Sequence, residues 1–341
     1  MYCSAACRQK AYRSRHAPPS GDPVPDLIAD VERRLRTLLP QSPDTFQADV
    51  DTLAESVRRL ELIADLAVAT GDTVFAGLVE PYHRELTLHC YRMLGSFDDA
   101  EHLVREALLA AARDGQPSGS STRSWLYQVV SLVCLDFLQT TRRRPLRGGR
   151  IPWLQPFPDR LLGGESRETV ELAFVVALQH LPPRQRAVLL LRDVLGWPAA
   201  RTAAGLELTV ASANGVLQRA RPTLRKYLPE RRIDWSGPVV ASDPVADPVL
   251  ARYVAAVCDP EALAGLLGPG VTVSRRMDCR ALPTAANRQP AAARYVRSPG
   301  TARYRAEAIE VLRIDDGLIV EIMAFEPHLF PAFGLPRTLG H

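Results

Sequence analysis

The sequence predicts a mainly α-helical protein, with two helical domains followed by a C-terminal α+β domain. Three observations lead to this class. Apolar residues recur every three or four positions through most of residues 26–230, as on one face of a helix. A Pro/Gly-rich stretch interrupts this pattern at 146–166. From 245 onward, polarity alternates on either side of Asp315-Asp316-Gly317, which is a hairpin signal.

The length and charge of the chain indicate a multidomain protein that meets nucleic acid. Its 341 residues suffice for two or three domains. The net charge is only +4, but arginines cluster at 142–150 and between Arg219 and Arg232, whereas 44–66 is acidic. Such asymmetry is typical of a protein that contacts DNA with some surfaces and protein with others.

The cysteines and the apolar runs bear on location. No apolar run approaches the roughly 18 residues of a membrane span, and no signal peptide is present, so we expect a cytoplasmic protein without membrane contact. The six cysteines are scattered apart from Cys3 and Cys7, which favours a reduced cytoplasm over a disulfide scaffold. MYCSAACRQKAYRSRH resembles half of a zinc ribbon, but zinc needs four ligands and His16 is a remote third. We expect residues 1–25 to be a basic tail and linker, with no metal and no cofactor.

Residues 26–72 predict a pair of amphipathic helices. The first has Leu27, Ile28, Val31, Leu35 and Leu38 on one face. In the second, apolar residues follow heptad a/d spacing over about three heptads. A helical hairpin that packs on the next domain and a dimerising coiled coil both fit this spacing. The heptad positions are Phe46, Val50, Leu53, Val57, Leu60, Ala64 and Ala67.

Residues 73–145 predict a three-helix domain. A nearly continuous amphipathic pattern is broken at Gly95-Ser96, and Asp98 is placed to cap the helix that follows. The last helix ends in an arginine run, Arg142 to Arg144. Its predicted apolar side consists of Trp125, Leu126, Val129, Val133 and Phe137.

Residues 167–230 contain a helix-turn-helix pattern. Pro182-Pro183 suits the first turn of a helix that Gly196 ends, and Trp197-Pro198 begins a short helix to about Ala204. After a turn at 205–208, Thr209 can cap a third helix. The predicted inner side of that helix is Val210, Ala213, Leu217 and Ala220.

The opposite side of the third helix is polar at its start and basic at its end. The polar end could reach base edges while the arginines meet phosphates. An ordinary helical bundle with a solvated basic face is the alternative. The residues of this side are Ser212, Asn214, Gly215, Gln218, Arg219, Arg221, Arg225 and Lys226.

Two of these domains resemble those of extracytoplasmic-function sigma factors. LPPRQRAVLLLRDVLGW followed by AN-x3-LQRAR resembles region 4, which reads the promoter −35 element. EPYxREL, HCYRMLGS-x-DDAE and SWLYQ-x5-CL resemble region 2. The resemblance implies promoter DNA and core RNA polymerase as partners, the latter through the clamp helices of its largest subunit and its flap. The linker 146–166 would then run extended through the polymerase channel between the two domains.

The same resemblance assigns roles to particular residues. Ser212, Asn214, Gly215, Gln218, Arg219, Arg221 and Arg225 would contact the −35 element. The −10 element would be melted and held by Ser120, Ser121, Thr122, Arg123, Trp125, Arg142, Arg143 and Arg144. The polymerase clamp would be bound by Asp98, Asp99, Glu101 and Glu106.

The linker segment PWLQPFPDRLL and residues 245–341 resemble a sigma subgroup with a C-terminal SnoaL-like cone, which implies a regulatory domain. That fold also hosts isomerases, which need an acid or base in an apolar pocket. The candidates are Asp278, Glu310, Glu321 and His328, whose spacing suggests no convergent set; Glu310 and Glu321 also fit outward positions of strands. We therefore expect no enzyme. A small ligand bound to the C-terminal domain is an alternative to plain packing.

A second class of function also fits the sequence. Arg105, Ala112, Arg201 and Glu207 replace residues usual in the resembling family. These substitutions fit a sigma-like DNA-binding regulator that has lost transcription initiation.

Overall fold

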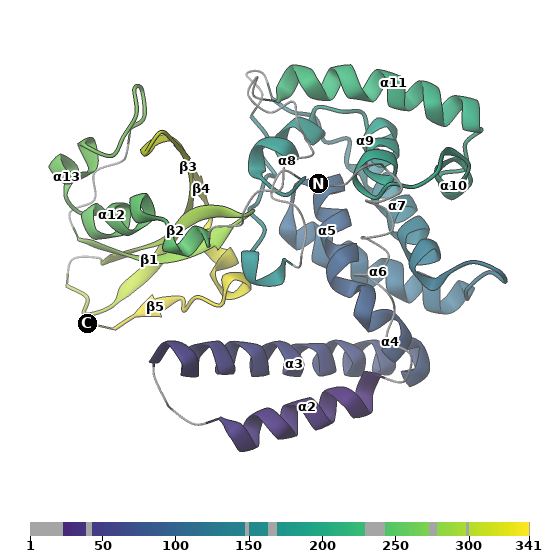
Figure 1. Ribbon diagram of the computed structural model, residues 1–341, viewed down its shortest axis with the longest axis horizontal. Helices are drawn as coiled ribbons and strands as arrows, with labels where there is room; N and C mark the ends of the chain where they lie inside the picture. Colours follow the sequence, from purple (N-terminus) through teal and green to yellow (C-terminus); the bar gives the residue numbers. More distant parts are fainter. Residues whose placement is uncertain are drawn as a thin grey trace, which may run out of the picture. The chain divides into compact units, whose positions relative to one another are not determined.

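A computed structural model describes residues 23–38, 43–146, 150–162, 169–228, 243–272, 278–297 and 300–340. Helices make up the described chain up to 228, and an antiparallel sheet dominates from 279 onward (Figure 1). The predicted mainly helical class with a C-terminal α+β domain is confirmed. The predicted basic tail, with Cys3, Cys7 and His16, lies outside the described residues.

The chain divides into two units, which are described separately. The first consists of residues up to 94, 99–143 and 183–220; the second consists of 95–98, 144–182 and residues from 221 on. Helix α8 (Leu172–Gln179) thus belongs to the second unit, while the helix-turn-helix elements up to residue 220 belong to the first.

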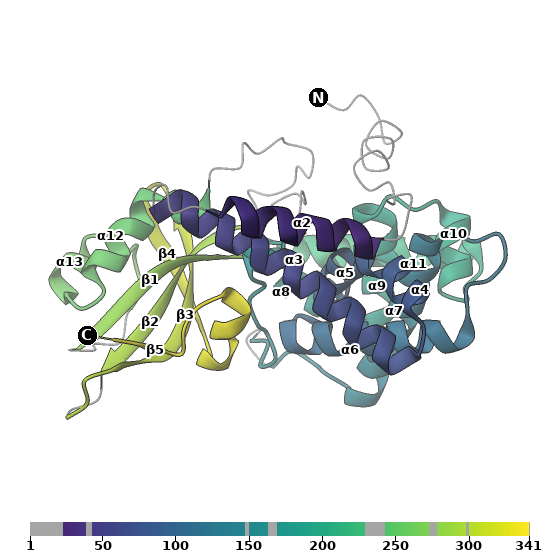
Figure 2. The same ribbon diagram turned by 90° about the horizontal axis from the view of Figure 1, so that it is seen from below.

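Helices α2 (Pro23–Thr37) and α3 (Pro43–Thr70) lie side by side in the first unit (Figures 1 and 2). Asp30 of α2 joins the two helices, because it accepts a 3.0 Å hydrogen bond from Ser56 of α3. Arg34, one turn further along α2, pairs with the same carboxylate at 2.7 Å. Arg34 and Arg33 hold the pKa of Asp30 down to about 2. The predicted apolar stripe of α2 is only partly correct: Leu27 is buried, but Ile28 and Leu35 are exposed.

The rest of the first unit begins with α4 (Thr73–Val79), a 3-10 turn at Glu80–Tyr82, α5 (His83–Leu94), α6 (Phe97–Asp114) and α7 (Thr122–Thr141). The predicted apolar side of α7 is wrong at Val129, Val133 and Phe137, which are half-buried. Apolar residues lie nearly all around α7, so spacing alone could not select its buried side. That side contains the predicted Trp125 and Leu126 together with Tyr127, Val130, Ser131, Cys134, Leu135 and Leu138.

The start of α6 differs from the prediction that Asp98 is its cap. The helix already begins at Phe97, so Asp98 lies within the first turn. Its backbone N–H donates to Gln155 Oε1 at 2.9 Å, and Ser96 Oγ donates to the same oxygen at 3.0 Å. The linker residue Gln155 therefore supplies the cap that the local sequence was expected to provide.

The helix-turn-helix consists of α9 (Pro183–Leu189), a π-turn at Leu190–Val194, α10 (Ala199–Gly205) and α11 (Val210–Tyr227). Arg186 of α9 is buried and donates to the carbonyl oxygen of Met93 at the end of α5. This contact fixes α9 against α5 within the first unit.

The C-terminal part of the second unit places α12 (Pro248–Ala256) and α13 (Pro260–Ala264) over the sheet (Figure 2). Tyr253 and Leu250 of α12 pack with Leu312 and Ile319 of the sheet. The predicted hairpin is confirmed, with Asp316 and Gly317 at positive φ. The strands are β1 (Cys279–Ala286), β2 (Gln289–Arg297), β3 (Tyr304–Asp315) and β4 (Leu318–Phe325) in that order, with β5 (Thr338–Leu339) on β3.

The cysteines depart from the expectation of unpaired thiols. A disulfide joins Cys258, just after α12, to Cys279, the first residue of β1. Cys90 and Cys134 are buried thiols whose sulfurs lie 3.4 Å apart between α5 and α7. Scattered spacing in the sequence gave no sign of either pair, because each joins positions that meet only in the folded chain.

Within the described ranges, no helix is both long enough and apolar enough to cross a bilayer. In the same ranges, His, Cys, Asp and Glu side chains form no group of three that could hold a metal ion.

The buried His89 makes the first unit sensitive to acid. It is 1% exposed, its Nε2 lies 2.9 Å from Ser131 Oγ, and burial lowers its pKa from 6.5 to about 3. Between these values the unfolded chain binds a proton that the folded chain does not. The contribution of His89 to the free energy of unfolding is therefore fully present above pH 6.5. It falls by about 1.4 kcal/mol per pH unit as the pH drops toward 3.

We expect His89→Gln to make this acid dependence shallower, as measured by urea unfolding at several pH values. His102→Gln is the matched control, because the side chain of His102 is 68% exposed. Equal slopes for His89→Gln and the unsubstituted chain would contradict the assignment.

Candidate nucleic-acid interface

Trp197 anchors the short helix α10 in the first unit. Its indole is buried and meets the Tyr127 ring edge-on, with ring centroids 6.1 Å apart. The backbone N–H of Trp197 donates to the carbonyl oxygen of Leu191 at 2.9 Å and so closes the turn that follows the π-helical segment Leu190–Val194. Arg201 lies over the indole at 4.1 Å. The substitution at Arg201 is therefore accommodated by a cation–π contact.

The turn between α10 and α11 contains Glu207 in a left-handed conformation, with φ +55°. The N–H of Leu208 donates to the carbonyl oxygen of Ala203 at 2.8 Å, and the N–H of Glu207 to that of Ala204 at 3.4 Å. This pair of bonds is a Schellman C-cap, whose left-handed position usually holds glycine. The chain therefore keeps the turn with a residue that disfavours its conformation.

Helix α11 has a buried and an exposed side. Thr209 Oγ1 accepts from the Ser212 N–H at 3.1 Å, so the predicted cap is present. The prediction for Val210 is wrong, since it is 45% exposed one residue after the cap. The buried residues are Ala213, Val216, Leu217, Ala220 and Leu224.

The exposed side of α11 is the surface most suited to nucleic acid. Asn214 and Gln218 are exposed near its start, and every charged residue of the helix is basic. A Cβ on Gly215 would lie 3.6 Å from Arg219 Nη1, so the Arg219 side chain extends back along the helix. Amides that can read base edges and cations that can meet phosphates thus share one face. Its other predicted members, Ser212, Arg221, Arg225 and Lys226, are also exposed.

At the start of α7, the predicted single-strand residues are engaged within the first unit. Ser120 Oγ donates to the Pro117 carbonyl oxygen at 2.8 Å, Ser121 caps α7, and Thr122 Oγ1 donates to Gln116 Oε1 at 3.0 Å. Arg123 forms a bidentate pair with Glu85 at 2.6–3.0 Å. Trp125 is 6% exposed and meets Phe75 edge-on. These groups lie together, but the Trp125 indole faces the core.

At the other end of α7, the arginine run is divided. Arg142 is exposed and forms the left-handed C-cap, with φ 48°. Arg143 lies 2.6 Å from Asp99 and over the Phe137 ring at 5.0 Å. Arg144 is exposed in the second unit.

Helix α6 presents carboxylates on a face that also exposes Arg105, which pairs with Asp65, and His102, which lies 3.4 Å from Glu106. Asp98, Glu101 and Glu106 are exposed at helical spacing. Asp99 is one-quarter exposed and paired with Arg143, so it belongs to a different side. In the second unit, His328 Nε2 lies 2.9 Å from Asp98 Oδ2, and Gln155 Nε2 donates to the same oxygen at 2.8 Å.

The linker lies on the β1–β2 turn of the second unit. Asn287 is fully buried, with Oδ1 accepting from the Phe157 N–H and Nδ2 donating to the Val170 carbonyl oxygen, both at 2.7 Å. The Arg288 N–H donates to Asp159 Oδ1 at 2.7 Å. Asn287 and Arg288 both have positive φ, so the turn itself aims these groups at the linker.

The four acid–base candidates of the C-terminal domain do not converge. Glu310, predicted to point outward as an alternative, is 3% exposed; it accepts from Tyr253 at 2.9 Å and pairs with Arg294 at 3.2 Å. Burial raises the pKa of Glu310 and that of Tyr253. Asp278 bonds Arg297 and Tyr304. Glu321 is half-exposed beside Arg313. His328 bonds Asp98.

Sequence reasoning missed Gln155, Phe157, Asp159, Asn287 and Gln289. Each makes its contact more than 50 positions away in the chain. Only Asn287 carried a local signal, because asparagine tolerates the left-handed conformation of a tight turn.

Comparison with known proteins gives two family matches. Sigma-70 region 2 matches residues 78–144, and Sigma-70, region 4 matches 171–224. The ECF RNA polymerase sigma factor SigG of Mycobacterium tuberculosis is 35% identical over an alignment of 349 residues. This alignment covers 84% of this chain and 92% of SigG. SigJ of the same organism is 30% identical over 208 residues, 57% of this chain and 62% of SigJ. A crystal structure of SigJ aligns with a TM-score of 0.49 and 23% identity, over 74% of this chain and 96% of that chain.

We expect Glu207→Gly to stabilise the first unit by about 0.5–1 kcal/mol, because glycine adopts positive φ without a steric penalty. Denaturant unfolding measures this change. Glu207→Ala is the matched control, since it removes the carboxylate and keeps the Cβ. If the alanine variant gained as much as the glycine variant, charge and not backbone conformation would be the cause.

Proposed function

The chain belongs to the extracytoplasmic-function sigma factors of the sigma-70 family, and from that premise we propose that it binds core RNA polymerase and directs it to particular promoters. The observation that carries this proposal is the exposed side of α11, where two amides and four basic residues stand on a helix without acidic residues. Such a helix fits the major groove, with Asn214 and Gln218 at base edges and Arg219 at a phosphate. The function places the chain in the cytoplasm.

Transcription with purified core polymerase tests the proposal. Fragmented genomic DNA serves as the first template, and the mapped transcripts then supply a defined promoter for run-off assays. We expect discrete run-off products that core polymerase alone does not yield. Co-elution with polymerase without such products would instead support the regulator that has lost initiation.

We expect Arg219→Ala to weaken binding to that promoter and to make its salt dependence shallower. Loss of one phosphate contact reduces the slope of log K against log salt by about 0.9. Fluorescence anisotropy over a salt series measures the slope. Arg36→Ala is the control, because this arginine is 79% exposed on α2. A slope unchanged by Arg219→Ala would remove Arg219 from the phosphate contacts.

For the −10 element, we propose that Arg142 and Arg144 meet the phosphates, since both are exposed. Ser120, Ser121, Thr122, Arg123 and Trp125 would contribute after a rearrangement of the loop that releases their present partners. Burial of Trp125 favours a structural role for its indole in the free chain.

For polymerase docking, we propose the exposed carboxylates of α6. Glu101 and Glu106 are exposed and would exchange their present contacts, which for Glu106 include His102, for a basic surface such as the clamp helices of the largest subunit. Asp98 would exchange His328 for the polymerase, and Asp99 would act indirectly by holding Arg143. The flap would be met by the helix-turn-helix.

The C-terminal domain is proposed to regulate initiation by holding the linker. Three hydrogen bonds with Asn287 and Arg288 fix Phe157 and Asp159, whereas a linker threaded between two DNA-bound domains must be free to extend. A domain that binds the linker therefore opposes the extended state.

We expect Asn287→Gly to loosen the linker while keeping the positive φ of the turn. Loss of two buried hydrogen bonds costs about 1–3 kcal/mol, so tryptic cleavage at Arg150 and Arg160 should quicken about tenfold or more. Run-off transcription should rise in parallel. Asp316→Gly makes the same backbone change in the exposed β3–β4 turn and serves as control. If cleavage became faster but the yield of transcript did not rise, the contact between Asn287 and the linker would be structural and not regulatory.

A further inference from the structure

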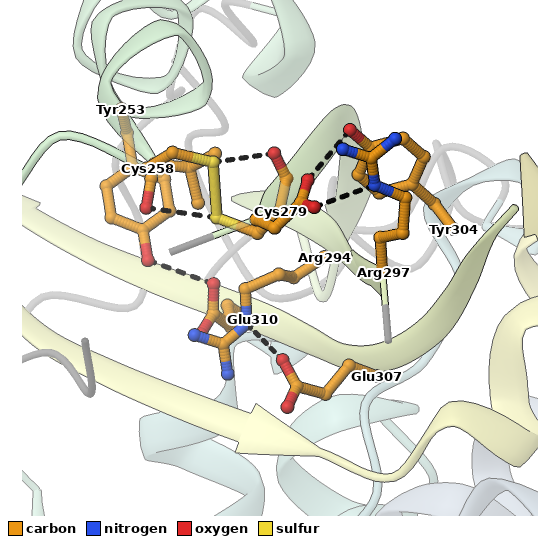
Figure 3. Close-up of a disulfide and its surroundings, with 10 residues drawn as sticks. Tyr253, Cys258, Cys279, Arg294, Arg297, Tyr304, Glu307 and Glu310 are labelled. Carbon is orange, nitrogen blue, oxygen red and sulfur yellow. Dashed lines mark hydrogen bonds and ion pairs between the residues drawn. A yellow bond between two sulfur atoms is a disulfide. The ribbon is translucent and has the colours of Figure 1, made fainter. Parts of the chain in front are cut away.

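We propose that Cys258 and Cys279 form a reversible thiol–disulfide site, oxidised by hydroperoxides and reduced by dithiols. Cys258 follows α12, and Cys279 opens β1, with Cα atoms 5.8 Å apart, within the usual range for a disulfide. Figure 3 shows the bond and its surroundings. Both residues belong to the second unit, so the site is complete within it.

The two cysteines are held together by contacts other than the disulfide. On one side, Tyr253 of α12 donates to Glu310 of β3 at 2.9 Å. On the other, Asp278 accepts from Arg297 at 2.7 Å and from Tyr304 at 2.9 Å, which fixes the start of β1. Reduction therefore leaves the sulfurs near one another, and the pair can close again.

Each cysteine sulfur lies beside a backbone carbonyl oxygen that can accept a hydrogen bond from its thiol. Cys258 Sγ lies 2.6 Å from the carbonyl oxygen of Cys279 (Figure 3). Cys279 Sγ lies 3.5 Å from the carbonyl oxygen of Val257. These oxygens can accept from the two thiols when the bond is open. Neither state thus leaves a buried donor without an acceptor.

Access and asymmetry assign a role to each cysteine. Both line an open depression of about 500 Å³, together with Val254, Val257, Arg280 and Leu282. Cys258 is exposed, whereas Cys279 is 7% exposed. Cys258 is therefore the sulfur that a small oxidant reaches first, and Cys279 is the resolving sulfur.

The oxidation proceeds in two balanced steps. The Cys258 thiolate attacks the terminal oxygen of the hydroperoxide; an S–O bond forms, the O–O bond breaks, and the departing alkoxide takes a proton. The Cys279 thiolate then attacks the sulfenic sulfur, so that the S–S bond forms and hydroxide leaves as water after protonation. Two thiols lose two electrons and two protons, and the hydroperoxide becomes an alcohol and water. Exchange with a dithiol reverses the change.

The redox conditions around the chain decide whether the Cys258–Cys279 disulfide opens. A chain that works beside RNA polymerase, as proposed above, does so where cellular reductants keep thiols reduced; this step rests on the proposed function. Under these conditions a cysteine pair at bonding distance forms a disulfide when an oxidant is present, and cellular dithiols reduce it again. The tests below read sulfur chemistry and stability, so their outcome is separate from that of the transcription assays.

The first test uses the full chain treated with dithiothreitol and then with hydrogen peroxide, alkylated and digested with trypsin. Peroxide should join peptides 253–275 and 277–280, and dithiothreitol under native conditions should separate them again and add two alkylated cysteines. The buried pair Cys90 and Cys134 is an internal control, because burial raises the pKa of Cys90 and both sulfurs are shielded. Peptides 85–92 and 124–142 should stay unlinked.

The second test compares thermal unfolding with and without dithiothreitol. Opening a cross-link over 21 positions should lower the Tm of the C-terminal domain by roughly 5–10 °C. Cys258→Ser with Cys279→Ser should remove this response while retaining the far-UV circular dichroism of the reduced chain. Three results would overturn the site: no linked peptide after peroxide, equal linking of the buried pair, or a disulfide that opens only after denaturation.

Discussion

The buried amide of Asn287 is the interaction on which the second unit depends. Its two ends bond Phe157 and Val170, and its backbone N–H donates to the Phe157 carbonyl oxygen at 2.9 Å. The neighbouring Gln289 Oε1 accepts from the Leu172 N–H at 3.0 Å and so caps α8. Ordering of the linker then positions Gln155, which caps α6. One tight turn of a sheet thus completes the ends of two helices, whose first N–H groups would otherwise lack partners.

The basic residues of α11 and the arginine at the start of α7 differ in their exposure. On α11 the charged residues stand exposed on one side, without an acidic residue in the helix. At the start of α7, by contrast, Glu85 neutralises Arg123 with both side chains largely buried. The basic side chains of α11 are therefore exposed to solvent, whereas Arg123 would have to give up its pair with Glu85 before it could meet another group.

The C-terminal domain contains a buried carboxylate that its own neighbours already bind. Glu310 is paired with Tyr253 and Arg294, and the depression at Cys258 and Cys279 opens elsewhere on the domain. A carboxylate held by its own neighbours is poorly placed to act as acid or base on a substrate. The Cys258–Cys279 pair and the turn at Asn287 and Arg288, which binds the linker, both fit a regulatory role.

The sequence by itself determined the helical class, the helix-turn-helix with its Thr209 cap, the hairpin at Asp316-Gly317 and the polar side of α11. These follow from local chemistry, since spacing, caps and turns involve residues only a few positions apart. Tertiary structure alone decided which side of α7 is buried, that Gln155 rather than Asp98 caps α6, that Val210 is exposed, and that Cys258 meets Cys279. The Gln155 cap joins positions 57 apart, and the disulfide joins positions 21 apart. Such contacts leave no periodic trace in the chain, because each is set by how separate elements pack.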